Sequence, residues 1–259
     1  MPPNIDKAIN LRRQCSHFRI LVIGRANAGK TTLLKKVCNS IEDPVIFSPS
    51  GDVVISPLCF LRGLHDIENQ LIFQSNPQFI FHDTRGFESG SVAETEKVKA
   101  FIAKRARSTE LSYQLHAIWQ VSSCSESGDD TTKWTTGTAS PQIPTGHFPV
   151  IAIFTMFDGL ITEAFTQLKE SGVGRKEAKD RQNEQAQEML TTKFVKPLMS
   201  TGYPPADHVR LDDMRLAANN CNELIKKTAN ALNDDTLKLL FVSVQQNNIN
   251  ICVNFAVEK

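Results

Sequence analysis

The chain has 259 residues, of which 41% are hydrophobic and 22% charged, an ordinary composition for a soluble globular protein. Its 29 basic and 28 acidic residues nearly cancel, so no overall field attracts nucleic acid or an anionic membrane surface. No run approaches the roughly 18 apolar residues of a membrane span, and the first residues lack the apolar centre of a signal peptide. We therefore expect a cytoplasmic protein with no evident nucleic-acid partner and no membrane span.

Short apolar runs alternate with helical patterns along the chain, which is typical of a mostly parallel α/β sheet. Residues 18–24, FRILVIG, predict a buried strand, and residues 28–40 predict a helix. Residues 70–84 predict two strands joined by a turn at residues 75–77, where a proline presets the reversal.

After these strands, Ser91 and Glu94 form the pattern of a capping box, which predicts the start of a helix. A further helix is expected where Cys221, Leu224 and Leu232 share one face. Strands are expected at residues 115–121, 149–157 and 237–244. The six cysteines are scattered without metal-ligand spacing, so we expect reduced thiols, several of them in the core.

The pattern fits a single domain with three irregular parts. Residues 1–17 form a lead-in before the first strand. Residues 122–148 are rich in Ser, Thr, Gly and Pro and predict a long polar mobile loop. Residues 159–236 predict a helical insertion before the last strand, with a charged stretch that indicates either a solvated face or a surface for a partner.

A phosphate-binding loop follows the first strand. Gly24, four residues, and then Gly29, Lys30 and Thr31 complete the pattern G-x-x-x-x-G-K-[ST]. Glycines let the backbone N–H groups point inward, the lysine supplies a charge for the β and γ phosphates, and the threonine hydroxyl can ligate Mg²⁺. The residues expected to bind nucleotide here are Gly24, Arg25, Ala26, Asn27, Ala28, Gly29, Lys30, Thr31 and Thr32.

A second element, FIFHDTRGF, ends a strand with Asp83 and places Gly86 three residues later. The carboxylate can hold Mg²⁺ through water, and the glycine N–H can approach the γ-phosphate. We therefore expect Thr31 and Asp83 at the metal, and Lys30, Thr31 and Gly86 as the catalytic groups.

These pieces, together with FTMFD at the end of residues 149–157, follow the order of the G1, G3 and G4 motifs of the TRAFAC class of GTPases, and the loop GRANAGKT most resembles the septin, Era and TrmE branch. More narrowly, RGLHDIENQ, SNPQFIFHDTRGFESG and LLFVSVQQNNI look like a family of fungal G-domain proteins. The resemblance runs over most of the chain but not through residues 122–148. It implies a three-layer P-loop NTPase G domain, whose six-stranded sheet is parallel except for its second strand.

The resemblance also implies how the base is read. The usual form [NT]-K-x-D is Thr155, Met156, Phe157, Asp158 in this sequence. Asp158 keeps the acceptor for the guanine N1–H and 2-amino groups, whereas Met156 replaces the lysine that covers the base. Ser243 stands where the G5 motif would follow the last strand.

Hydrolysis has less support from the sequence. Phe87 follows the DxxG glycine, where Ras-like enzymes carry a glutamine that orients water, and residues 41–69 contain no threonine for switch I. Catalytic groups would then come from a partner or effector, a second copy of the domain in a nucleotide-dependent homodimer, or a cation. In TrmE-like GTPases the asparagine matching Asn27 holds K⁺; alternatively Asn27 only hydrogen-bonds within the loop.

The sequence thus predicts a guanine-nucleotide-binding switch that binds Mg·GTP and hydrolyses it slowly to GDP. Two alternatives remain open. The first is a nucleotide-binding scaffold that has lost hydrolysis, and the second is an ATPase or small-molecule kinase on the same P-loop.

Overall fold

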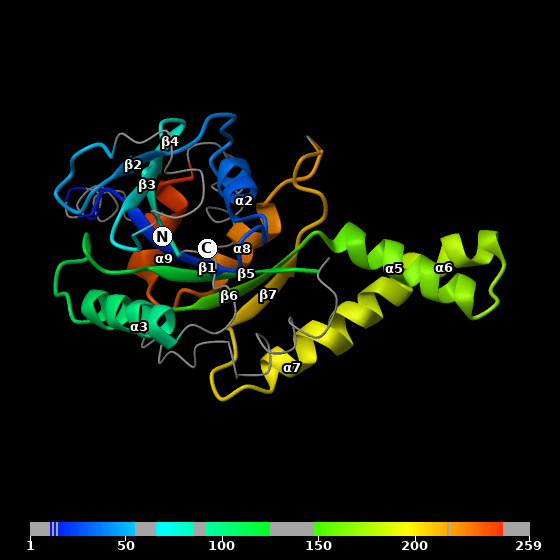
Figure 1. The fold of residues 1–259 in the computed structure, drawn as a ribbon. Helices are drawn as coiled ribbons and strands as arrows, with labels where there is room; N and C mark the ends of the chain where they lie inside the picture. The colour runs from blue at the N-terminus through cyan, green and yellow to red at the C-terminus, as the bar shows by residue number, and fades with distance from the viewer. Residues whose placement is uncertain are drawn as a thin grey trace, which may run out of the picture.

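The computed structural model describes residues 11, 13, 15–54, 66–84, 92–124, 148–216 and 218–245. One twisted sheet of seven strands forms the centre of this part of the chain, with helices on both faces (Figure 1). The strands lie in the order β2-β3-β4-β1-β5-β6-β7. Their bounds are β1 Phe18–Gly24, β2 Val45–Phe47, β3 Gln70–Phe73, β4 Asn76–Asp83, β5 Ala117–Ser123, β6 Val150–Thr155 and β7 Asp207–Arg210.

The expected mostly parallel sheet is confirmed. Strand β1 pairs in parallel with β4 and β5, and β5, β6 and β7 continue the parallel arrangement. Strand β3 pairs antiparallel with both β2 and β4, so it alone runs against the others. The sheet has seven strands rather than the expected six, because the short edge strands β2 and β7 were not foreseen and the expected strand at residues 237–244 is a helix.

Alternation along β1 divides the core into two layers. Phe18, Ile20 and Val22 belong to the cluster that includes helices α2 (Lys30–Val37), α8 (Asn222–Ala231) and α9 (Asp235–Ser243). Leu21 and Ile23 point to the other face, where α3 (Val92–Ala106) covers them. Every residue of β1 is buried, as the apolar run FRILVIG predicted.

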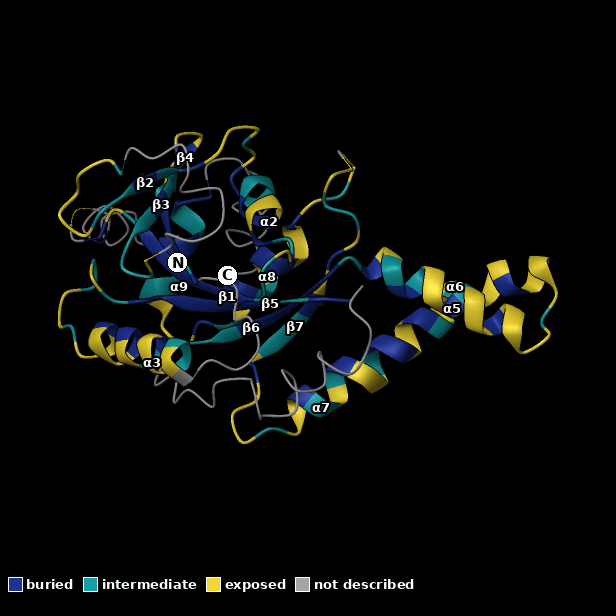
Figure 2. Ribbon diagram, in the orientation of Figure 1, coloured by how far each residue is buried: buried dark blue, intermediate teal, exposed yellow. Residues whose placement is uncertain are grey.

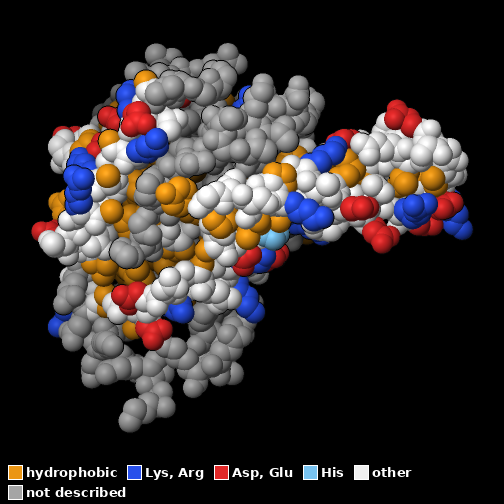
Figure 3. Space-filling model, turned by 90° about the horizontal axis from the view of Figure 1, so that it is seen from below, with side chains coloured by type: hydrophobic (Ala, Val, Ile, Leu, Met, Phe, Trp, Pro, Cys, Tyr) orange, Lys and Arg blue, Asp and Glu red, His pale blue; other side chains and the backbone are white. Residues whose placement is uncertain are grey.

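A helical hairpin projects from the β6 side of the sheet (Figures 1 and 2). Helix α5 (Phe157–Glu170) goes out, and α6 (Arg175–Leu190), the π-helical turn η1 (Thr191–Val195) and α7 (Lys196–Met199) return. The buried residues of α5 recur every three or four positions and form one stripe: Phe157, Leu160, Ala164 and Leu168. The first three share a core cluster with the returning helix. The outer surface carries charges of both signs (Figure 3).

The expected strand at residues 237–244 is wrong, because this stretch forms helix α9. Leu237, Leu240, Phe241 and Val244 follow helical spacing and belong to or pack against the core cluster. The Asp234 side chain also caps the helix by accepting a bond from the Thr236 N–H at 2.6 Å. A continuous apolar run fits a buried strand or a buried helix equally well, and the cap was the overlooked signal.

Residues 159–236, which were expected to form a helical insertion, also contain the unforeseen strand β7. Only Val209 of this four-residue strand is buried, so its sequence carries almost no alternating pattern. The other expected strands and helices are present within their described residues, with bounds shifted by a few positions. The turn between β3 and β4 falls at residues 74 and 75 rather than 75–77, and Pro77 lies in β4. The Ser91 cap and almost all of the expected polar loop lie outside those residues.

Two further expectations agree with the described residues. Cys15, Cys38, Cys124 and Cys221 are buried free thiols. Among the described residues, no helix has the length and apolar character needed to cross a membrane.

Candidate functional site

The loop between β1 and α2, where a phosphate-binding loop was expected, turns sharply before the helix. Gly29, which immediately precedes α2, has a left-handed φ of 83°, and Asn27 has a φ of 62°. Glycine adopts this conformation without strain, and asparagine tolerates it better than most side chains. The Ala28 N–H donates back to the Arg25 carbonyl at 3.3 Å. The chain therefore curls immediately before a helix N-terminus, where N–H groups favour an anion.

Gly24 is required by packing between strands. A Cβ atom on Gly24 would lie 2.3 Å from the carbonyl oxygen of Val121 on β5. No side chain fits at that distance, because the obstacle is backbone of the neighbouring parallel strand. The first glycine of the motif thus sets how closely β1 and β5 approach where the loop begins.

Lys30 places its charge inside the loop. Its ammonium donates to the carbonyl oxygens of Gly24 at 3.1 Å and Arg25 at 2.9 Å, and its side chain is only 8% exposed. The same nitrogen lies 3.8 Å from the Asp83 carboxylate at the end of β4. The predicted phosphate-binding lysine and the predicted metal carboxylate are therefore neighbours, although 53 residues separate them in the sequence.

The oxygen atoms near this pair suit Mg²⁺. Thr31 lies in the first turn of α2 with an exposed side chain, and Asp83 is the last residue of β4. A hydroxyl and a carboxylate are hard ligands, and Mg²⁺ in nucleotide sites takes its remaining ligands from phosphate and water. Among the described residues, no group of three or more His, Cys, Asp or Glu could hold a metal alone. The residues present fit a metal that arrives with a nucleotide.

The expected base-recognition segment lies directly beside the loop. The Thr155 hydroxyl donates to the Ala28 carbonyl at 2.8 Å. Met156 follows with a left-handed φ of 56°, and its sulfur accepts a bond from the Ser123 hydroxyl at 3.4 Å. Asp158 lies in the first turn of α5 and is exposed. The carboxylate that was expected to read guanine is therefore accessible at the edge of the sheet where the P-loop lies.

Ser243 is not part of this site, which corrects the expected G5 position. Its hydroxyl donates to the Leu240 carbonyl at the end of α9. The next residue, Val244, accepts a bond from Asn76, the first residue of β4. An eight-residue strand separates that point from Asp83, a distance of roughly 20 Å or more. Ser243 therefore lies near the end of the sheet opposite to Asp83 and the P-loop.

The residues that follow β7 lie beside the segment that was expected to recognise the base. The Phe157 N–H donates to the Leu211 carbonyl at 3.4 Å, and the Leu211 N–H donates to the Phe154 carbonyl at 2.7 Å. Asp213 and Arg215 follow in the same loop. No sequence pattern marks this segment, because the strand β7 before it has four residues and only one of them is buried.

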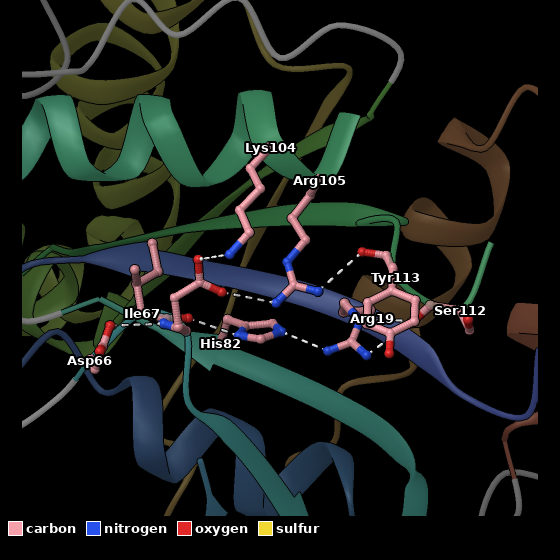
Figure 4. A network of polar contacts seen from close by, with 9 residues as sticks. Arg19, Asp66, Ile67, His82, Lys104, Arg105, Ser112 and Tyr113 are labelled. Atoms are coloured by element: carbon pink, nitrogen blue, oxygen red, sulfur yellow. Dashed lines mark hydrogen bonds and ion pairs between the residues drawn. The ribbon is translucent and has the colours of Figure 1, made fainter. Parts of the chain in front are cut away.

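A polar network around the buried His82 lies on the face of the sheet that α3 covers (Figure 4). Arg19 donates to the His82 Nε2 at 2.8 Å and to the Ser112 carbonyl. The Nδ1 atom of His82 lies 2.8 Å from the Ile67 carbonyl. A guanidinium only donates and a carbonyl only accepts, so His82 is neutral with its proton on Nδ1. Burial, followed by the charge of Arg19, lowers the pKa of His82 to about 3.

The same network anchors the residues that precede β3. Glu68 accepts bonds from Lys104 at 2.7 Å and Arg105 at 3.1 Å, both on α3. Arg105 also donates to the Tyr113 carbonyl. Since His82 immediately precedes Asp83, these contacts fix the strand that carries the predicted metal carboxylate. No motif indicated this support, because its members are scattered along the chain.

Gly86, Phe87 and residues 55–65 of the stretch where switch I was expected lie outside the described residues. Within the described loop, Arg25 and Ala26 are half-buried, whereas Asn27 and Thr32 are exposed. The site brought together by the structure therefore comprises the P-loop, Lys30, Thr31, Asp83 and Asp158.

Comparison with known proteins gave similarity to solved structures only. No family model matches the sequence. No curated protein matches it either. The complex of SsGBP with GDP is 14% identical, covering 83% of this chain and 50% of that one, with a TM-score of 0.40. A GTP-binding protein from the archaeon Sulfolobus solfataricus, in complex with GDP, is 11% identical over 93% and 56%, also at 0.40.

A third structure belongs to work on dimerization and the GTPase activity of the chloroplast translocon components atToc33 and psToc159. It is 13% identical, covers 89% of this chain and 90% of that one, and has a TM-score of 0.45. This chain spans only about half the length of the two GDP complexes.

Proposed function

We propose that the protein binds guanine nucleotides with Mg²⁺ and hydrolyses GTP slowly, acting as a molecular switch. One observation carries this proposal: the Lys30 ammonium is fixed inside a curled loop at a helix N-terminus, 3.8 Å from Asp83. This arrangement suits a magnesium-bound triphosphate, because it offers a positive charge, inward N–H groups and a carboxylate in one place.

Guanine selectivity is attributed to Asp158. An ionised carboxylate only accepts hydrogen bonds, which matches the N1–H and 2-amino donors of guanine and not the edge of adenine. Thr155 supports this assignment, since it fixes the segment that carries Asp158 against the P-loop.

The metal would be held by Thr31 and, through water, by Asp83. When bound, Mg²⁺ neutralises charge on the β and γ phosphates. Lys30 would contact the same phosphates, and its two carbonyl partners keep its stem in position. Because Phe87 cannot orient a water molecule, we propose that hydrolysis is slow unless a second copy, an effector or a cation supplies the missing group.

The test begins with nucleotide extraction from the purified protein, followed by affinities for GDP, GTP, ADP, ATP and XDP. We expect guanine nucleotides to bind more tightly than adenine nucleotides. Asp158→Asn should weaken GDP and strengthen XDP, because the new amide can donate to the 2-carbonyl of xanthine. Asp180→Asn, at an exposed aspartate on α6, is the matched control and should leave all five affinities unchanged. Equal affinity of the unmodified protein for ATP and GTP would refute guanine selectivity.

A nucleotide-binding scaffold is the second candidate, and it is favoured by Phe87 and by Met156 in place of lysine. Single-turnover assays separate the two functions. GTP that stays intact on protein that binds it tightly would favour the scaffold.

A further inference from the structure

A polar cavity of about 330 Å³ lies between the end of α2, the start of β4, the start of α8 and the residues that follow α9. Asn76 lines it and is the first residue of β4, whereas Asp83 is the last residue of the same strand. The Ser75 hydroxyl donates to the Cys38 carbonyl at 2.9 Å, which holds the end of α2 beside that strand. Eight extended residues span roughly 20 Å or more, so the cavity is separate from the nucleotide site.

Side-chain amides form most of the polar wall of this cavity. A primary amide both donates and accepts hydrogen bonds, as a sugar hydroxyl also does. A volume of about 330 Å³ has room for roughly ten water molecules, which is more than one bridging water needs and is at the lower end of the range for ligand sites. The amides belong to Asn39, Asn76, Asn219, Asn220, Asn222 and Gln245.

The amide of Asn76 has one unsatisfied atom. Its Nδ2 donates to the Val244 carbonyl at 3.1 Å, whereas its Oδ1 has no hydrogen-bond partner among the described residues. Asn76 is only 1% exposed, and a buried acceptor without a donor is unfavourable. Because Asn76 lines the cavity, a hydroxyl group bound there can supply the missing donor.

The cavity carries a positive charge. Among the described residues that line it, Lys36 on α2 is charged and none is acidic. The Lys36 ammonium donates to the Leu216 carbonyl at 2.8 Å, and its other N–H groups can serve a further acceptor. Burial raises the pKa of the Cys221 thiol, which also lines the cavity, to about 12, so this group is uncharged at neutral pH. These groups favour an anion over a cation.

Helix α8 strengthens this preference, because its N-terminal end lines the same cavity. The first N–H groups of a helix have no partners within it, and the helix dipole places partial positive charge there. The Asn220 Oδ1 accepts from the Asn222 N–H at 3.0 Å, and the N-cap residue adds no side-chain bond. Glu223 in the same turn is paired with Lys227 at 3.3 Å. An anion in the cavity can therefore meet both the Lys36 ammonium and the start of a ten-residue helix.

We propose that this cavity binds a small phosphorylated sugar, with its phosphate at Lys36 and the start of α8 and a hydroxyl that donates to the Asn76 Oδ1. The phosphate offers acceptors to the ammonium and to the helix N–H groups. The sugar hydroxyls match the remaining amides, because both kinds of group donate and accept. A neutral sugar leaves the positive end without a partner, and inorganic phosphate leaves most of the amides unmatched.

The test is equilibrium binding of glucose 6-phosphate and ribose 5-phosphate to the full chain, with glucose, ribose and inorganic phosphate measured beside them. We expect at least one sugar phosphate to bind saturably and more tightly than its separate parts. Lys36→Ala should weaken that binding about tenfold or more, as expected for loss of a charge-assisted hydrogen bond, and Lys36→Arg should restore part of it. Lys35→Ala is the matched control and should change nothing, since Lys35 lies on the same helix, pairs with Asp43 at 2.7 Å and does not line the cavity.

The same titrations on Lys30→Ala distinguish the cavity from the P-loop, which also attracts phosphate. Binding that survives Lys30→Ala and is weakened by Lys36→Ala would support the cavity site. Binding that Lys30→Ala removes and Lys36→Ala leaves unchanged would overturn it, because the ligand would then occupy the P-loop. Absence of binding by both sugar phosphates, or equal affinity for inorganic phosphate, would overturn it as well.

Discussion

The Thr155 hydroxyl donates a hydrogen bond of 2.8 Å to the carbonyl oxygen of Ala28, and this bond joins the proposed base site to the phosphate-binding loop. Thr155 is 3% exposed and Ala28 is 1% exposed, so water cannot replace either partner. The two residues are 127 positions apart, so the bond connects two distant segments of the chain within the proposed site.

Thr155→Val should lower the free energy of unfolding by about 1 to 3 kcal/mol, because it leaves the buried Ala28 carbonyl without its hydroxyl donor. GDP affinity should fall as well, since the P-loop and residues 156–158 lose their direct connection. Urea unfolding with and without GDP measures both effects. Thr155→Ser keeps the hydroxyl and serves as the control. Identical stability of the valine variant and the unmodified protein would contradict the importance of this bond.

Lys30→Ala and Thr31→Ala should distinguish what the lysine charge and the metal ion each contribute to nucleotide affinity. Loss of Lys30 removes the buried ammonium and should abolish nucleotide binding. Loss of the Thr31 hydroxyl should mainly remove the Mg²⁺ dependence of GTP affinity, because a hydroxyl ligates the metal without carrying charge. Titrations with GTP and GDP, each with Mg²⁺ and with EDTA, provide the measurement. Normal nucleotide binding by Lys30→Ala would show that the P-loop assignment is wrong.

Acidification below pH 6.5 should destabilise the protein. Burial, then the Arg19 charge, lowers the pKa of His82 to about 3, and burial lowers that of His116 to about 4. Between about pH 4 and 6.5 the unfolded chain therefore binds protons that the folded chain does not. Stability is fully present above pH 6.5 and falls by up to about 1.4 kcal/mol per pH unit for each histidine. Urea midpoints between pH 5 and 7 measure the slope.

His82→Gln is the informative variant for this pH dependence. A glutamine amide offers an acceptor for Arg19 and a donor for the Ile67 carbonyl, yet it does not titrate. The slope should therefore become shallower, because one titrating group is removed. An unchanged slope would show that His82 is not the source.

Basal GTP hydrolysis should not exceed about 10⁻⁴ to 10⁻³ per second, the scale of a GTPase without an assisting group. Single-turnover assays in matched potassium and sodium buffers, at several protein concentrations, then test the exposed Asn27. A faster rate in potassium that Asn27→Ala removes would assign the cation role to this side chain. If the rate depends neither on the cation, nor on protein concentration, nor on the Asn27 side chain, Asn27 only forms hydrogen bonds within the loop.

Local patterns predicted the order of strand, loop and helix around the expected phosphate site correctly. The sequence GRANAGKT follows an apolar run and precedes a helical pattern, and the structure has β1, a loop with left-handed Asn27 and Gly29, and α2 in that order. Asp83 and Asp158 were found for the same reason, since each follows a recognisable buried strand. These features depend on residues close together in the chain, where spacing, glycine content and apolar periodicity directly constrain the backbone.

Contacts between distant residues had no comparable signal. The sequence by itself determined the P-loop, the strands that lead to Asp83 and Asp158, and the alternation of the α/β sheet. Only the tertiary structure decided that β7 is the edge strand, that Ser243 lies far from the site, and that Leu211 after β7 contacts Phe157 at the start of α5. The physical reason is that a four-residue edge strand with one buried side chain is stabilised by pairing with its neighbour β6, and that pairing leaves almost no pattern in the strand itself.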